Sequence, residues 1–114
     1  MVSIIIPSCK DPCLQRTVDD LRQKAEGKIE IVVVLDGTRT EVKNADIILF
    51  NEKRIGMRSS INRGVEASHG EYVMKTDAHC MFGQGYDVKL LTDIEDDWVV
   101  VPRRYKLDID KWEI

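Results

Sequence analysis

The sequence predicts an α/β fold with a Rossmann-like, mostly parallel sheet and flanking helices, on two observations. Short runs of apolar and β-branched residues alternate along the chain with segments whose apolar residues recur at helical spacing. The strand-like runs are apolar throughout, as expected of parallel strands that helices cover on both faces. The 114 residues contain no recognisable linker, repeat or low-complexity segment, so a single domain over residues 1–114 is expected.

Five strands are expected from the apolar runs. They cover residues 2–7 (VSIIIP), 29–35 (IEIVVVL), 45–50 (ADIILF), 71–76 (EYVMKT) and 98–102 (WVVVP). Each run is short and rich in β-branched or aromatic residues, which favours strands over helices.

Three helices are expected between these strands. Residues 13–25 follow Asp11, a candidate N-cap with a proline directly after it. Residues 57–68 place apolar side chains at every fourth position, with Gly64 as a point of close contact to a neighbouring element. Residues 86–94 form the third expected helix.

The composition excludes several classes of protein. A net charge of −3 and a pI near 5.4 argue against nucleic-acid binding, which needs a basic face. The apolar runs are far shorter than the ~20 residues of a membrane helix, and the start of the chain does not resemble a secretory signal. Cys9, Cys13 and Cys80 are odd in number and form no CxxC pair, which favours reduced, buried or half-buried thiols in a cytoplasmic protein.

Polar residues that end strands are the first candidates for chemistry, because ligands of parallel sheets bind beyond the carboxyl ends of the strands. Ser8 and Cys9 follow the first strand, Asp36 the second, and Asp77 and His79 the fourth. A carboxylate and an imidazole two residues apart suit Mn²⁺, with zinc and iron as alternatives. Such a metal would leave coordination positions for a diphosphate and would neutralise charge on a leaving phosphate. The alternative for this Asp-x-His is a solvated turn after the strand.

Three longer segments follow one another along the chain. They are VSIIIPS at the first strand, IEIVVVLDG at the second, and RIGMRSSINRGVEASHGEYVMKTDAHC through the fourth. Their order resembles that of family 2 glycosyltransferases with the A-type fold, over nearly the whole chain. The segment 54–80 is also similar to the polypeptide N-acetylgalactosaminyltransferases, which share its R-x-G opening, its later R-G and a D-x-H-C motif. The resemblance implies transfer of a sugar from a nucleotide-diphosphate donor, a UDP-sugar, to an unknown acceptor, with Mn²⁺ or Mg²⁺ as cofactor.

The resemblance also assigns roles to residues. It assigns Pro7, Ser8, Cys9, Asp36, Arg54, Asp77 and Ala78 to the nucleotide sugar, and Asp77 and His79 to the metal. Asp36 would accept a hydrogen bond from the base, and Arg54 would offer a guanidinium to planar or anionic groups. The alternatives are a turn aspartate before a glycine and a surface arginine.

The chain departs from the family pattern at three points. Leu35 stands where many members have a second acidic residue, and Met81 stands where the N-acetylgalactosaminyltransferases continue with an acidic one. The chain also ends soon after the fifth expected strand, so the half with the acceptor site is expected to be absent and the domain incomplete. No general base is recognisable, because Asp87, Asp93 and residues 95–97 are explained better as a solvated surface.

Two further hypotheses therefore stand beside the enzyme. One is a module that binds a UDP-type ligand without turnover, and the other is a remnant of the fold that binds no nucleotide. An unfinished fold would also expose apolar surface, so self-association is an expected property.

Overall fold

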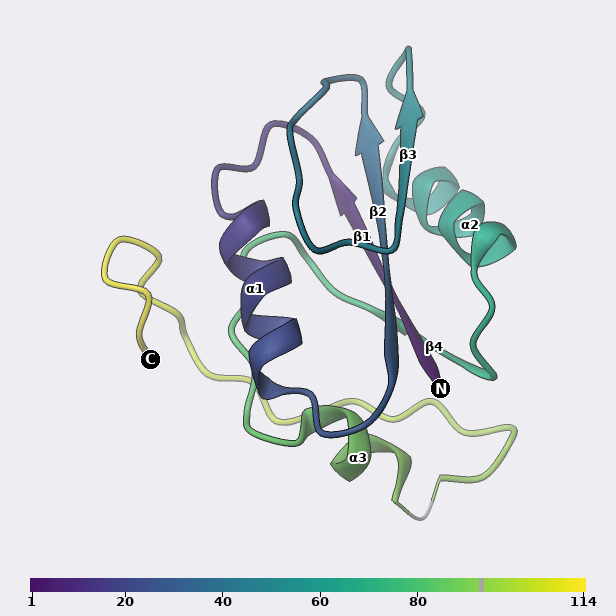
Figure 1. Ribbon diagram of the computed structural model, residues 1–114, viewed down its shortest axis with the longest axis vertical. Helices are drawn as coiled ribbons and strands as arrows, with labels where there is room; N and C mark the ends of the chain where they lie inside the picture. Colours follow the sequence, from purple (N-terminus) through teal and green to yellow (C-terminus); the bar gives the residue numbers. More distant parts are fainter. Residues whose placement is uncertain (93) are drawn as a thin grey trace.

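The structure, a computed structural model, describes residues 1–92 and 94–114. Within these residues, four strands form one parallel sheet in the order β3-β2-β1-β4 (Figure 1). They are β1 (Val2–Ser8), β2 (Ile29–Asp36), β3 (Ile47–Asn51) and β4 (Tyr72–Lys75). The predicted α/β fold with a parallel sheet is confirmed, and the first four expected strands lie within two residues of the observed ones.

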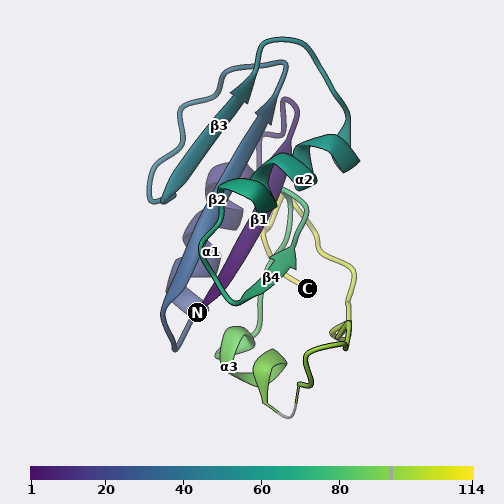
Figure 2. The ribbon, with the colours of Figure 1, turned by 90° about the vertical axis from the view of Figure 1, so that its right-hand side faces the viewer.

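Helices cover both faces of this sheet. α1 (Leu14–Lys24) lies on one face and α2 (Met57–Ala67) on the other (Figure 2). The short α3 (Tyr86–Leu91) lies near the end of α1, where the Tyr86 hydroxyl donates a hydrogen bond to the Leu21 carbonyl over 2.9 Å.

The hydrophobic core lies on the two central strands, whose successive side chains point to opposite faces. On the α1 side it consists of Ile4, Ile6, Ile31, Val33, Leu35, Leu14, Val18 and Leu21, with smaller contributions around them. On the α2 side, Ile5, Val32 and Val34 form a second cluster. A Cβ atom on Gly64 of α2 would lie 2.6 Å from Cγ2 of Ile5, so the predicted close contact at this glycine is confirmed. Burial of each large side chain contributes on the order of 2 kcal/mol, so this two-sided core is the main support of the sheet.

The expected fifth strand is wrong. Residues 98–102 have no strand conformation in the structure, and the side chains of Val99 and Val101 are 91% and 73% exposed. A run of β-branched residues becomes a strand only when a neighbouring strand pairs with it and a core covers it. Residues 98–102 have the composition of a strand, but no neighbouring strand pairs with them in the described part of the chain.

Two helix boundaries also differ from expectation. Asp11 is not the N-cap of α1; that position belongs to Cys13, and Oδ1 of Asp11 instead accepts the Cys13 amide over 2.8 Å in the turn before the helix. α3 ends at Leu91, three residues before the predicted end, and residue 93 of the predicted helix lies outside the described residues.

Two observations bear on the class of protein. In the described part of the chain, no helix is both long and apolar enough to cross a membrane. The cysteines are free thiols, with Cys13 buried and Cys9 and Cys80 half-buried, as expected.

Candidate functional site

The carboxyl ends of the parallel strands bring the candidate residues to one edge of the sheet (Figure 1). Ser8, Asp36 and Asn51 are the last residues of β1, β2 and β3, and Asp77 lies two residues after β4. Because neighbouring strands run in the same direction, residues that are distant in sequence share this edge. The candidate residues therefore lie at the edge of the sheet where the sequence predicted a site.

Asp36 is a buried carboxylate that accepts three hydrogen bonds at this edge. Its side chain takes the amide of Ile55 over 2.8 Å, the amide of Gly56 over 3.0 Å and Nδ2 of Asn51 over 3.0 Å. Burial alone raises the pKa of Asp36, but these hydrogen bonds and the Arg54 charge outweigh burial and hold the pKa below its ordinary value. Nε of Arg54 lies 4.0 Å from Oδ2 of Asp36, on a side chain that is 72% exposed.

These bonds give Asp36 a structural role. Gly56 is the N-cap of α2 and has a φ of 88°, a conformation that favours glycine. Asp36 thus fixes the loop between β3 and α2 and the start of the helix. A carboxylate has about four acceptor positions, so one remains for the base of a nucleotide, and the predicted contact stays a prediction.

The end of β4 carries an ion pair that includes Asp77. Nζ of Lys75 lies 2.6 Å from Oδ1 of Asp77, and the Asp77 side chain is 41% exposed. The hydrogen bond from Lys75 is the main cause that lowers the pKa of Asp77, and the charges of Lys75, His79 and Arg104 act in the same direction. Asp77 is therefore an accessible carboxylate in a positive environment, suited to an ionised, ligand-binding state.

His79 forms a hydrogen bond from the D-x-H turn to the loop after β1. Its Nδ1 lies 2.8 Å from Oδ2 of Asp11, and its side chain is 55% exposed. Since a carboxylate accepts hydrogen bonds, the contact puts a proton on Nδ1. In the neutral ring, Nε2 then keeps its lone pair for another partner.

The backbone after His79 is fixed to α1. The amide of Cys80 donates to Oγ1 of Thr17 over 3.1 Å, and the amide of Phe82 donates to Oδ2 of Asp20 over 2.7 Å. Ala78 is 3% exposed and packs in the core. A bound nucleotide sugar could therefore contact only the backbone of this residue. The turn therefore has a half-buried acid, a buried alanine and an exposed imidazole in succession.

The side chains of Asp77 and His79 offer donor atoms of the kinds that divalent cations bind. The oxygen of Asp77 and Nε2 of His79 are donors that Mn²⁺ accepts. Among the described residues, no group of three or more His, Cys, Asp or Glu side chains forms a closed metal cage. Two protein ligands leave the remaining positions to a diphosphate, water or groups from outside the described chain.

The end of β1 and the loop after it complete the edge. Ser8 is buried, and Pro7 and Cys9 are half-buried. Lys10 has a φ of 55°, a left-handed conformation that turns the chain sharply toward Asp11. The three residues assigned to the base and ribose thus share this edge with Asp36, and their contacts to a nucleotide remain predictions.

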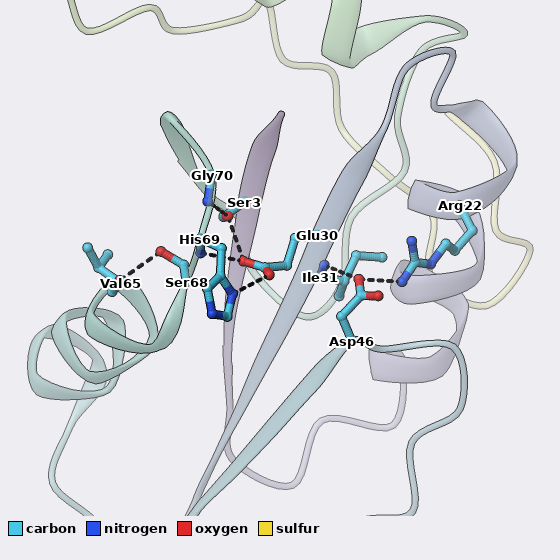
Figure 3. A network of polar contacts seen from close by, with 9 residues as sticks. All are labelled: Ser3, Arg22, Glu30, Ile31, Asp46, Val65, Ser68, His69 and Gly70. Carbon is cyan, nitrogen blue, oxygen red and sulfur yellow. Dashed lines mark hydrogen bonds and ion pairs between the residues drawn. The ribbon is translucent and has the colours of Figure 1, made fainter.

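A second polar cluster lies at the opposite edge of the sheet (Figure 3). The carboxylate of Glu30 accepts the Ser3 hydroxyl, the His69 amide and Nδ1 of His69, each over 2.8 Å, and the Ser3 hydroxyl accepts the Gly70 amide over 2.8 Å. These bonds connect the segment between α2 and β4 to the starts of β1 and β2. His69 is therefore bound to a structural acid, far along the strands from His79.

The expectation that Asp87 belongs to a solvated surface is wrong. Asp87 is 4% exposed, and its carboxylate accepts the amides of Glu26 and Gly27 over 2.9 and 2.7 Å. Burial raises the pKa of Asp87, but the backbone hydrogen bonds outweigh it and lower the pKa. The residue fixes the turn before β2, at the edge opposite the candidate site. Asp93 lies outside the described residues.

Sequence reasoning missed the partners of the site residues. Lys75 could have been found, because it carries the opposite charge and lies only two residues before Asp77. Asn51 had a weaker signal, as a polar residue that ends a strand. Asp11 was recognised only as a helix cap, because its partner His79 lies 68 positions away.

Comparisons with known proteins found a matching family and a similar solved structure. The family described as Glycosyl transferase family 2 matches residues 3–114 of the chain. Among solved structures, the fold is similar to that of the mannosyltransferase PcManGT from Pyrobaculum calidifontis in complex with GDP-Man and Mn²⁺, with a TM-score of 0.69. The two chains are 21% identical, and the match covers 81% of this chain but 32% of that one, so the likeness concerns the fold and the chain spans about a third of that protein. No curated protein matches the chain.

Proposed function

The chain belongs to glycosyl transferase family 2, and we propose that it binds the nucleotide-sugar donor of a glycosyltransferase, with Asp77 and His79 as ligands of a divalent metal. The observation that carries the proposal is the turn after β4. There an accessible carboxylate and an imidazole with a free nitrogen lie at the edge where parallel sheets bind ligands.

The proposed donor is a nucleoside diphosphate sugar. The similarity of residues 54–80 to the N-acetylgalactosaminyltransferases supports a UDP-sugar, while the structure of PcManGT was determined with GDP-Man. Pro7, Ser8 and Cys9 form the loop around base and ribose in this proposal. Asp36 offers its remaining acceptor position to the base.

The chain's own residues bind and orient the leaving group. Asp77 and His79 hold Mn²⁺ or Mg²⁺, which supplies charge neutralisation at the departing diphosphate. Arg54 has an exposed guanidinium beside the buried carboxylate of Asp36 and donates hydrogen bonds to the same anion.

Calorimetric titration of UDP, with GDP in parallel, tests the proposal. Binding is expected in the micromolar range when Mn²⁺ is present and to weaken strongly without it. His79→Ala is expected to remove the metal-dependent part, because it deletes one of the two protein ligands. The uridine assignment predicts that UDP binds more tightly than GDP.

The chain offers a matched control in its other histidine. His69 lies at the opposite edge of the sheet and binds Glu30, so His69→Ala should affect stability and leave the UDP affinity unchanged. Absence of binding by the wild-type chain at millimolar UDP and Mn²⁺ would contradict the proposal and favour a remnant without ligand.

A binding module without turnover is the second candidate. It is favoured because the chain spans about a third of the mannosyltransferase, at 32% coverage. Release of UDP from a UDP-sugar by the chain alone would support an enzyme. Binding of the UDP-sugar without release of UDP would support a binding module.

We also propose that the chain self-associates through its exposed apolar segment. Four large residues of this segment are exposed: Trp98, Val99, Val101 and Tyr105, to 53%, 91%, 73% and 64% of their full surface. Large exposed apolar surface often marks a site of protein interaction. Sedimentation velocity should show a sedimentation coefficient that rises with concentration, less so in a Val99→Glu/Val101→Glu variant. A sedimentation coefficient that stays at the monomer value up to high concentration would contradict self-association.

A further inference from the structure

We infer that Asp11 is a positioning residue for His79: its carboxylate holds the imidazole with the proton on Nδ1 and so reserves Nε2 for the metal. The inference rests on the proposed metal site and adds a residue to it. Asp11 itself is not one of the proposed metal ligands. It acts through the ring that it binds.

Asp11 is well placed for this role because it is itself fixed. Its Oδ1 accepts the Cys13 amide over 2.8 Å, and its Oδ2 lies 2.8 Å from Nδ1 of His79. The side chain is 19% exposed, while that of His79 is 55% exposed. One carboxylate thus spans the turn before α1 and the turn after β4.

The backbone on either side of His79 has little freedom of its own. Ala78 is buried in the core, and the Cys80 amide donates to Oγ1 of Thr17. The side-chain torsions of His79 are then the main remaining freedom of the ligand. The bond to Asp11 restricts them before any metal binds, so less conformational entropy is lost on binding.

The bond also affects the ligand nitrogen itself. A carboxylate that accepts the N–H of a metal-binding histidine fixes the tautomer and raises the basicity of the opposite nitrogen. Loss of such a partner weakens metal binding by about 10- to 100-fold in other proteins. A site with only two protein ligands depends strongly on each of them.

The test measures Mn²⁺ binding to the chain alone, through the EPR signal of the free ion. Asp11→Ala is expected to raise the Kd for Mn²⁺ by about 10- to 100-fold. Asp11→Asn can still accept the Cys13 amide and preserve the turn. Its NH2 group then faces Nδ1 of His79 as a donor and favours the proton on Nε2, so the Kd should rise about as much as in Asp11→Ala. Glu66→Gln removes an acidic charge from an exposed position on α2, and it should bind Mn²⁺ like the wild type.

A spectroscopic measurement separates positioning from a merely structural role. Imidazole ¹⁵N shifts should show His79 with its proton on Nδ1 in the wild-type chain, and a shift toward the Nε2-protonated tautomer in Asp11→Ala. Thermal unfolding of Asp11→Asn shows whether the fold is retained while the affinity falls.

The possible failures are distinguishable. If His79→Ala loses Mn²⁺ and Asp11→Ala binds it like the wild type with the same tautomer, the role of Asp11 is wrong and the metal site stands. If His79→Ala binds Mn²⁺ like the wild type, or the wild type binds none, the proposed metal site fails and the inference fails with it.

Discussion

Replacement of Asp36 by alanine is expected to destabilise the chain by about 3 kcal/mol, because the change removes a buried acceptor that three donors share. The amides of Ile55 and Gly56 and the side-chain amide of Asn51 all donate to this one carboxylate. Two of these donors lie at the start of α2, so the loss should extend to the packing of that helix on the sheet. Urea denaturation followed by circular dichroism measures the difference in the free energy of unfolding.

Two further variants make this measurement specific. Asp36→Asn retains one acceptor oxygen and should destabilise the chain less than Asp36→Ala. Glu66→Ala changes an exposed acid on α2 and should leave the free energy of unfolding within about 0.5 kcal/mol of the wild type. If Asp36→Ala were as stable as Glu66→Ala, the carboxylate would not be what fixes the loop.

The same carboxylate gives stability a pH dependence of definite sign. The folded-state pKa of Asp36 lies below its ordinary value of 3.8, and the pKa values of Glu30 and Asp87 are also lowered. A lowered folded-state pKa means that the contribution to stability is fully present above the unfolded-state pKa and is lost as the pH falls through the folded-state pKa. The wild-type chain should therefore lose stability below about pH 4. Asp36→Asn should show a shallower acid limb than the wild type.

The sheet could be predicted because the amino-acid composition of its strands reflects how deeply they are buried. β1 and β2 are mostly apolar on both faces, and that pattern is typical of parallel strands that helices cover on both sides. The edge that carries Ser8, Asp36 and Asp77 then follows from parallel topology alone. Residues 98–102 have the same composition, but whether they pair depends on a neighbour that their sequence does not contain.

The contacts within the site could not be predicted, because they join residues that only the folded chain brings together. Asp11 lies 68 positions from His79, and Asp87 lies 60 positions from the Gly27 amide that it accepts. Both acids look like ordinary turn or surface residues in sequence, since aspartate is common in turns. Their roles depend on which backbone or ring faces them, and this is a property of the tertiary packing.

Opposite effects on metal affinity are expected from the two partners of the ion pair after β4. Asp77→Asn should raise the Kd for Mn²⁺ by about 100-fold or more, because it removes the only proposed carboxylate ligand. Lys75→Met should lower the Kd by up to about fivefold, the equivalent of a partly exposed ion pair of up to about 1 kcal/mol. The reason is competition, since Nζ of Lys75 lies 2.6 Å from the oxygen that the metal would bind. EPR of free Mn²⁺ measures both values.

Competition between Lys75 and the metal for Asp77 can be recognised by combining variants of the two residues. Lys75 opposes cation binding in two ways: its Nζ occupies Oδ1 of Asp77, and its positive charge repels the cation. Both effects vanish in Lys75→Met. Lys89→Met removes an exposed positive charge on α3 and should leave the affinity unchanged. The double variant Lys75→Met/Asp77→Asn should bind Mn²⁺ as weakly as Asp77→Asn alone, because the lysine acts mainly through the carboxylate. If Lys75→Met instead weakened Mn²⁺ binding, the lysine would be holding Asp77 in its binding position, and the ion pair would be part of the site.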